Sequence, residues 1–311
     1  MEQKFQNITI DDIIVGEPLP APIYLYIDLR YIIFRAKGDV VDRSVHERLE
    51  MRKITNLYVM KIDHQKLKDW KTTFLAKTPK LPDEAKDLSK LKKELHRATL
   101  DIFLSEHPNE AIKKAVSASK KVATEVMKAP LSVKALAQLQ TFSSNSVCHS
   151  MNVSILSTYL ALQMGYSHLP ILQHLATGSL LHDIGKLKIK LEDIDSPEVN
   201  RKKMEQHPLV GVEYLQSENP ALAQEVVLII AQHHELHDGT GYPRKLRGNA
   251  IYDLARIVSL ANTFDELVAN CSGTLQERQK KAVKQLGEMI YHNKFEPDKH
   301  QKVLRILDLG V

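Results

Sequence analysis

Two short stretches of this 311-residue chain concentrate histidine and carboxylate side chains. Residues 178–187 read GSLLHDIGKL, with His182 and Asp183 adjacent, and residues 233–243 read HHELHDGTGYP. More than half of the 14 histidines lie between residues 149 and 237. Imidazole and carboxylate groups together are typical ligands of divalent transition metals. The concentration of these residues therefore predicts a metal centre.

The pairs of adjacent ligands favour two ions rather than one. Adjacent residues on a helix point roughly 100° apart, so His182 and Asp183 cannot both grip a single ion symmetrically. They can reach neighbouring ions, and the two oxygens of Asp183 allow it to bridge a metal pair. His233 and His234 repeat this geometry. We therefore expect a dinuclear site.

Two further histidines are candidate ligands. His149 lies in a helical pattern at 144–163, and His207 precedes Pro208 at an expected helix start. A lone histidine on an amphipathic helix is more often an ordinary core or surface residue, so spacing alone does not assign either one. We expect the following histidines to be surface residues: His168, His174, His237, His292 and His300.

The two motifs resemble the signatures of HD-GYP domains, a branch of the HD metal-dependent phosphohydrolases. HDIGK begins at His182, and HHELHDGTGYP is an unbroken match to the family pattern HHExxDGxGYP. The resemblance covers about residues 135–275. It implies an all-α bundle that binds two or three ions, commonly iron or manganese, and hydrolyses the bacterial messenger cyclic di-GMP. The ligands it implies here are His149, His182, Asp183, His207, His233 and His234.

Lys186 and Asp183 are the residues that we expect to carry catalysis. Two ions can neutralise a phosphodiester and lower the pKa of a water molecule, and Asp183 would help to hold them. Lys186, within HDIGK, would hold a phosphate oxygen and stabilise developing charge. The alternative for Lys186 is a surface salt bridge. In the second motif we expect Glu235 and Asp238 to fix the loop rather than bind metal.

Three departures from the family pattern weaken the expected activity. Asn145 stands where trinuclear members carry a glutamate, so we expect two ions rather than three. In LANTFDELV, Asn262 stands at the position of the family's last ligand aspartate, and it could bind through its amide oxygen. Asp265, one turn later, could replace the missing ligand directly or through water. Residues 269–276 lack the RPYR-like cations that hold substrate phosphates.

Three functions are consistent with these residues. The first is a dinuclear metal phosphodiesterase that hydrolyses cyclic di-GMP or a related phosphoester with weakened activity. The second is a catalytically impaired cyclic-dinucleotide sensor or docking module that keeps its metal centre. In that case the loop of Gly241, Tyr242 and Pro243 would present Tyr242 to a signalling partner. The third is an enzyme acting on a nucleotide or another phosphomonoester.

The elements that position these residues predict an α+β protein. Residues 1–77 are expected to form a small mixed α/β accessory domain, with a strand-rich stretch at 24–34 leading into a turn at AKGDVV. A short helix near 46–53 and a strand at 56–60 should follow. Residues 78–130 are expected to be a linker with connecting helices, whose apolar stripes belong to the core or to a homodimer. Residues 131–311 should form the all-α HD-type metal-binding bundle.

Composition excludes several other classes of protein. The net charge of +5 is concentrated in residues 61–97, where lysines outnumber acids. No aromatic residues alternate with them as in a base-stacking surface, so we expect a solvated helix face and no nucleic-acid partner. The two cysteines, Cys148 and Cys271, are too few for a disulfide framework. No signal peptide or apolar run of about 18 residues is evident, so we expect a cytoplasmic protein.

Overall fold

The computed structural model describes residues 4–14, 17–27, 29–41, 45, 49, 54, 56–77, 83–104, 108–128, 146–190, 196–271 and 275–308. They fall into two compact units, an N-terminal unit that reaches residue 80 and a helical unit that starts at residue 81. The expected combination of a small α/β domain and a helical bundle is confirmed. No helix among the described residues is long and apolar enough to span a membrane.

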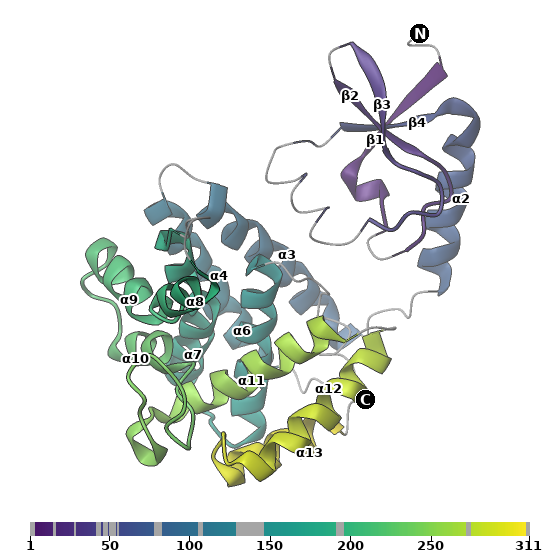
Figure 1. The fold of residues 1–311 in the computed structure, drawn as a ribbon. Coiled ribbons are helices and arrows are strands. Elements are labelled where there is room, and N and C mark those ends of the chain that lie inside the picture. Colours follow the sequence, from purple (N-terminus) through teal and green to yellow (C-terminus); the bar gives the residue numbers. More distant parts are fainter. Residues whose placement is uncertain are drawn as a thin grey trace. The chain divides into compact units, whose positions relative to one another are not determined.

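The N-terminal unit is a four-stranded antiparallel sheet with one long helix against it (Figure 1). The strand order is β1-β4-β2-β3. Its elements are β1 (Phe5–Thr9), the short 3-10 turn η2 (Ile10–Asp12), β2 (Ile23–Ile27), β3 (Arg30–Arg35), β4 (Asn56–Met60) and α2 (Lys61–Lys77). Along β4, Leu57 and Val59 are buried and their neighbours are not, because alternate residues of a strand face opposite sides. Leu67 and Trp70 of α2 pack against this apolar face.

The hairpin in this unit turns earlier than the sequence suggested. The stretch 24–34 is divided between β2 and β3, and Ile27 pairs with Arg30. Only two residues therefore connect the strands, and Leu29 adopts a positive φ of 61°. Tight hairpin turns require such backbone angles. The strand expected at 56–60 is present as β4, whereas the helix expected at 46–53 falls largely outside the described residues.

The helical unit has one continuous apolar core. Its first half comprises α3 (Asp83–Leu104), α4 (Pro108–Lys128), α6 (Ser146–Gln163) and α7 (Leu169–Leu181). Leu95 of α3 and Val122 of α4 are fully buried in that core. Residues 78–130 were expected to form a linker with connecting helices. In the structure α3 and α4 are instead part of the bundle. Their apolar stripes are used within this chain.

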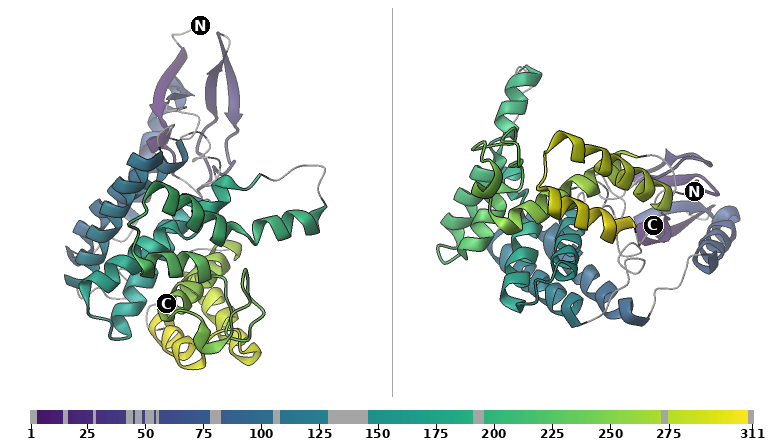
Figure 2. Two further views of the ribbon diagram at one scale, coloured as in Figure 1. Left: turned by 90° about the vertical axis from the view of Figure 1, so that its left-hand side faces the viewer. Right: turned by 90° about the horizontal axis from the view of Figure 1, so that it is seen from below.

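The second half of the bundle surrounds α6 and α7. Its elements are η3 (Ile184–Lys188), α8 (Pro197–Met204), α9 (His207–Glu218), α10 (Gln224–Gln232), η4 (Gly248–Ala250), α11 (Asp253–Asn270), α12 (Leu275–Glu288), η5 (Met289–His292) and α13 (Pro297–Asp308). Helix α11 packs on α6, and α12 and α13 pack beside α11. Helix α8 buries none of its residues and projects from the bundle (Figure 2). Helix α6 carries His149, and α11 carries Asn262 and Asp265.

A cluster of charged side chains ties α11 to α13. Lys299 Nζ lies 2.7 Å from Asp253 Oδ1 and 3.1 Å from Glu296 Oε2. Arg256 Nη1 lies 2.8 Å from Glu296 Oε2, and the Tyr166 hydroxyl donates to Asp253. Burial alone would raise the pKa of Asp253, but hydrogen bonds from Lys299 and Tyr166 lower it overall.

Candidate metal centre

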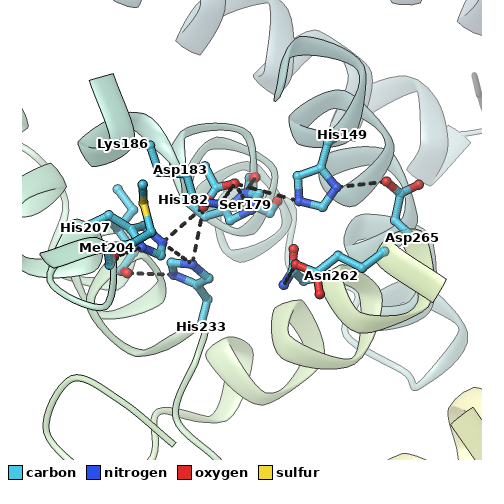
Figure 3. A network of polar contacts seen from close by, with 12 residues as sticks. His149, Ser179, His182, Asp183, Lys186, Met204, His207, His233, Asn262 and Asp265 are labelled. Atoms are coloured by element: carbon cyan, nitrogen blue, oxygen red, sulfur yellow. Dashed lines mark hydrogen bonds and ion pairs between the residues drawn. The ribbon is translucent and has the colours of Figure 1, made fainter. Parts of the chain in front are cut away.

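The six side chains expected as ligands converge at one place in the helical unit, and Figure 3 labels all of them except His234. They form two groups that share Asp183. One group contains Asp183 with His207, His233 and His234, and the other contains Asp183 with His149 and His182. Within each group the ligand atoms lie within 4.8 Å of one another. A carboxylate common to two sets of histidines is the arrangement that two neighbouring cations require.

Ends of helices deliver most of these side chains. His182 caps the C-terminus of α7, and Asp183 precedes η3 directly. His207 is the first residue of α9, and His233 caps the C-terminus of α10. His182 and His233 keep right-handed helical φ and ψ angles, whereas Asp183 departs from them with a φ of −96° and a ψ of 2°.

His233 and His234 belong to the same group rather than to neighbouring ions. Helix α10 ends at Gln232, and the two rings lie with their centroids 4.2 Å apart. The prediction that this pair divides between two ions therefore finds no support in the grouping of its side chains.

Gly185 allows the two motifs to approach each other. A Cβ on Gly185 would lie 2.0 Å from the backbone oxygen of His207 and 2.6 Å from the backbone nitrogen of Gly211. Any side chain at this position would force η3 and α9 apart. Gly185 is therefore required for a close contact between backbones, and this contact brings His207 to Asp183.

Three of the histidines are oriented in the same way. In each, Nδ1 donates to the backbone carbonyl three residues earlier: His182 to Ser179 (2.7 Å), His207 to Met204 (2.8 Å) and His233 to Ile230 (2.8 Å). A carbonyl only accepts, so Nδ1 must carry the proton. In the neutral ring Nε2 is then left with a free lone pair, which is the form that binds a metal.

The free lone pairs face one another. His207 Nε2 lies 3.2 Å from His233 Nε2 and 3.1 Å from Asp183 Oδ1. Burial, and then the neighbouring histidines, lower the pKa values of His233 and His234 well below the usual range, so both rings are neutral. Among the described residues, the buried Nε2 atoms of His182 and His234 have no hydrogen-bond partner. Converging unpartnered acceptors in a buried site fit a divalent cation.

Asp183 remains ionised although it is buried. Burial alone would raise its pKa, but His182, His207 and Lys186 hold the pKa well below its usual range. Lys186 Nζ lies 2.6 Å from Asp183 Oδ2, and its side chain is 36% exposed. The ammonium group of Lys186 thus lies at the edge of the site, joined to a candidate ligand and open to solvent.

Asp265 occupies a supporting position behind His149. Asp265 Oδ2 accepts from His149 Nδ1 at 2.8 Å, and Oδ1 accepts from Asn152 Nδ2 at 2.9 Å. Both oxygens are engaged, and Asp265 lies outside both ligand groups. These contacts indicate that Asp265 orients His149, and direct metal binding by Asp265 finds no support in them. Burial would lower the pKa of His149, but Asp265 and then Asp183 raise it overall.

Asn262 faces the cluster from α11 (Figure 3). It is 3% exposed, and its Nδ2 donates to Glu266 Oε1 at 3.1 Å. Its Oδ1 is buried and has no hydrogen-bond partner among the described residues. Sequence reasoning missed Glu266 and Asn152. Both lie one helical turn from a candidate ligand, at i+4 from Asn262 and i+3 from His149, and that spacing was available as a signal.

The loop after His234 is fixed by its own carboxylates, as expected. The two oxygens of buried Glu235 accept the backbone N–H groups of Arg244 and Leu246, at 2.7 and 2.8 Å. Asp238 accepts from Thr240. These contacts hold the chain that follows the ligand pair.

The glycines of this loop differ in their roles. Gly239 has a φ of +80°, which glycine adopts without strain, whereas a Cβ on Gly241 would lie 2.4 Å from the backbone oxygen of His234. Tyr242, which precedes Pro243, stacks on His234 with ring centroids 4.5 Å apart. Tyr242 thus faces the cluster and supports the His234 ring.

Other expectations have different outcomes. His300 was expected at the surface but is fully buried, and its Nε2 lies 2.8 Å from the carbonyl oxygen of Leu286. The apolar pattern of α13 turns that position into the core. Asn145, and residues 272–274 of the stretch that lacks the expected cations, lie outside the described residues.

A family profile and several known proteins resemble this chain. The profile of the HD domain family matches residues 126–298. The chain is 40% identical over 93 residues to the cyclic di-GMP phosphodiesterase response regulator RpfG of Xanthomonas campestris, covering 29% of this chain and 25% of that protein. It is 33% identical over 125 residues to a cyclic di-GMP phosphodiesterase of Thermotoga maritima, covering 39% and 34%. It is 26% identical over 228 residues to a cyclic di-GMP phosphodiesterase of Pseudomonas aeruginosa, covering 70% and 53%.

These matches span a quarter to about half the length of the three relatives. A solved structure shares the fold more completely. It is Bd1817, an HDG"Y"P protein from Bdellovibrio bacteriovorus, with a TM-score of 0.61, 24% identity, and coverage of 98% of this chain and 99% of that chain. The chain belongs to the HD domain family, and it shares the fold of an HD-GYP-type protein.

Proposed function

We propose that this chain is a dinuclear metal phosphodiesterase that hydrolyses a cyclic dinucleotide. One observation carries the proposal: Asp183 is shared by two sets of histidines. The mixed nitrogen and oxygen donor set, without a thiolate, suits iron or manganese. Two adjacent divalent ions are the usual device for splitting phosphodiesters.

When bound, the ions would supply neutralisation of the phosphodiester charge and activation of the attacking water. The residues of this chain would hold and orient them. His207, His233 and His234 would serve one ion, His149 and His182 the other, and Asp183 both. Lys186 would hold a substrate phosphate oxygen, because its ammonium group is partly exposed beside Asp183.

The relatives support a cyclic dinucleotide as the substrate class. The three relatives described above are named cyclic di-GMP phosphodiesterases, and two further relatives from Vibrio cholerae are named 3'3'-cGAMP-specific phosphodiesterases. Both molecules are cyclic dinucleotides that present two phosphodiester bonds. We therefore infer cyclic di-GMP as the first substrate to test and 3'3'-cGAMP as the second.

A metal-containing binding module with little catalysis is the second candidate. The neutral Asn262 at the position of the family's ligand aspartate favours it. Docking of a partner through Tyr242 has weaker support, because Tyr242 packs against His234.

The proposed function is tested by counting metal and following cleavage together. The protein would be loaded anaerobically with Fe(II) or Mn(II), its metal measured by mass spectrometry, and cleavage of both dinucleotides followed by chromatography. We expect about two ions per chain and metal-dependent cleavage. Asp183→Asn should lower the rate more than about 100-fold, since changes outside the ligand shell alone cost about 10–100-fold.

Asp101→Asn is the matched control, because Asp101 is an exposed residue of α3. It should behave as the unaltered protein. Tight dinucleotide binding by metal-loaded protein without cleavage would favour the binding module. Cleavage that survives Asp183→Asn would refute the site assignment.

A further inference from the structure

We propose that Glu266 completes the metal centre, by turning the Asn262 oxygen toward the ions and by adding a negative charge beside them. The inference rests on the proposed metal centre and deepens it. Glu266 is an exposed residue of α11, one turn after the buried Asn262. It therefore acts on the site from the solvent side.

The first step concerns the orientation of the Asn262 amide. An ionised carboxylate only accepts hydrogen bonds, so the amide group facing Glu266 must be the NH₂ group. Nδ2 of Asn262 indeed lies 3.1 Å from Glu266 Oε1. The oxygen is then directed away from Glu266. This is the only orientation in which a neutral amide offers a metal a ligand atom.

The second step concerns what the Asn262 oxygen meets. Oδ1 is buried and lacks a hydrogen-bond partner among the described residues. A buried acceptor without a partner is energetically unfavourable. Asn262 faces the histidine cluster in Figure 3. A cation bound in the cluster would satisfy this oxygen, as it would the free nitrogens of His182 and His234.

The third step concerns charge. Five of the six candidate ligands are histidines, which bind metals as neutral rings, and Asp183 is the only anion among them. One negative charge poorly balances two divalent ions. Asp265 accepts a hydrogen bond from His149, and Glu266 adds a further negative charge one hydrogen bond from Asn262. Glu266 compensates in this way for the neutral side chain at position 262, which it contacts through the Asn262 amide.

The test measures metal binding rather than turnover. Metal-free protein would be titrated with Mn²⁺ by calorimetry, and bound ions counted after dialysis. Glu266→Ala removes both the acceptor and the charge, and should weaken binding of at least one ion by about 10–100-fold. Glu266→Gln keeps an acceptor oxygen but loses the charge, so its affinity should lie between those of Glu266→Ala and the unaltered protein.

A rescue experiment separates this role from a general effect on folding. Adding Asn262→Asp to Glu266→Ala returns a carboxylate to the site and should restore most of the lost affinity. Glu288→Gln, at an exposed position of α12, is the matched control and should bind Mn²⁺ normally. Because Glu266 is exposed, the metal-free variants should melt as the unaltered protein does.

The outcomes distinguish this inference from the proposed function. If the unaltered protein binds no Mn²⁺, the proposed metal centre itself is refuted. If it binds two ions and Glu266→Ala binds both with unchanged affinity, only the role of Glu266 is overturned. Failure of Asn262→Asp to restore affinity in the Glu266→Ala background would likewise overturn it.

Discussion

The contact at Gly185 makes a sharp prediction about the assembly of the site. In Gly185→Ala, the new Cβ would lie 2.0 Å from the His207 backbone oxygen, and such contacts essentially never occur below 3.0 Å. Helix α9 and η3 would have to separate by about 1 Å. Neither neighbour is a flexible side chain, so the strain should approach the upper end of the usual overpacking cost, about 3 kcal/mol.

This cost should be visible in both stability and metal binding. For a unit of this size each kcal/mol lowers the melting temperature by about 2–4 °C, so we expect a loss of about 6–12 °C. His207 moves with α9, so its group should lose affinity for Mn²⁺. Calorimetric melting of the metal-free protein and a Mn²⁺ titration measure the two effects.

Gly287→Ala provides the matched control for this experiment. A Cβ on Gly287, in α12, would meet only the Leu304 side chain at 3.9 Å. Replacing a helical glycine by alanine there should leave the melting temperature unchanged or raise it. Gly185→Ala protein that melts and binds metal normally would refute the close-contact explanation.

Three further predictions concern other parts of the helical unit. Asp265→Asn should weaken metal binding at the His149 group by about 10–100-fold, as outer-shell changes do; an unchanged Mn²⁺ titration would contradict the supporting role. Glu235→Ala leaves the backbone N–H groups of Arg244 and Leu246 without their acceptor. Each of these groups that stays buried should lower the free energy of unfolding by about 1–3 kcal/mol. A melting temperature equal to that of the unaltered protein would contradict this structural role of Glu235. The pKa of the Asp253 carboxyl group is lower in the folded protein than in the unfolded chain. The unfolded chain therefore binds a proton there more tightly, and the contribution of Asp253 to folding stability is lost as the pH falls below about 5. Asp253→Asn should therefore make the melting temperature fall less steeply between pH 5 and pH 3. The change in the free energy of unfolding should be less than about 1 kcal/mol, because the Asp253 side chain is 45% exposed. A slope identical to that of the unaltered protein would exclude the effect.

The side chains that converge at the candidate site were predictable, because most of them lie in two short motifs. His182 with Asp183, and His233 with His234, are adjacent pairs, and the structure brings both pairs together with His149. The grouping of His233 with His234 was not predictable, because it depends on how α9 packs on α10 and brings the His207 ring beside both of theirs.

The supporting residues were harder to predict. Asp265 and Glu266 are consecutive acids on α11, and the sequence alone does not reveal which one faces His149. The rotation of α11 against α6 decides this, and tertiary packing sets that rotation. The same limitation applied to His300, because its burial depends on how α13 docks onto the core.

The backbone hydrogen bonds of His182, His207 and His233 make these three ligands robust to mutation. Their acceptors are carbonyl groups, which every amino acid provides, so substitutions at Ser179 or Met204 leave the acceptor in place. His149 depends instead on the side chain of Asp265, which a single nucleotide change can remove. Sequence drift should therefore misorient His149 before it misorients His182, His207 or His233.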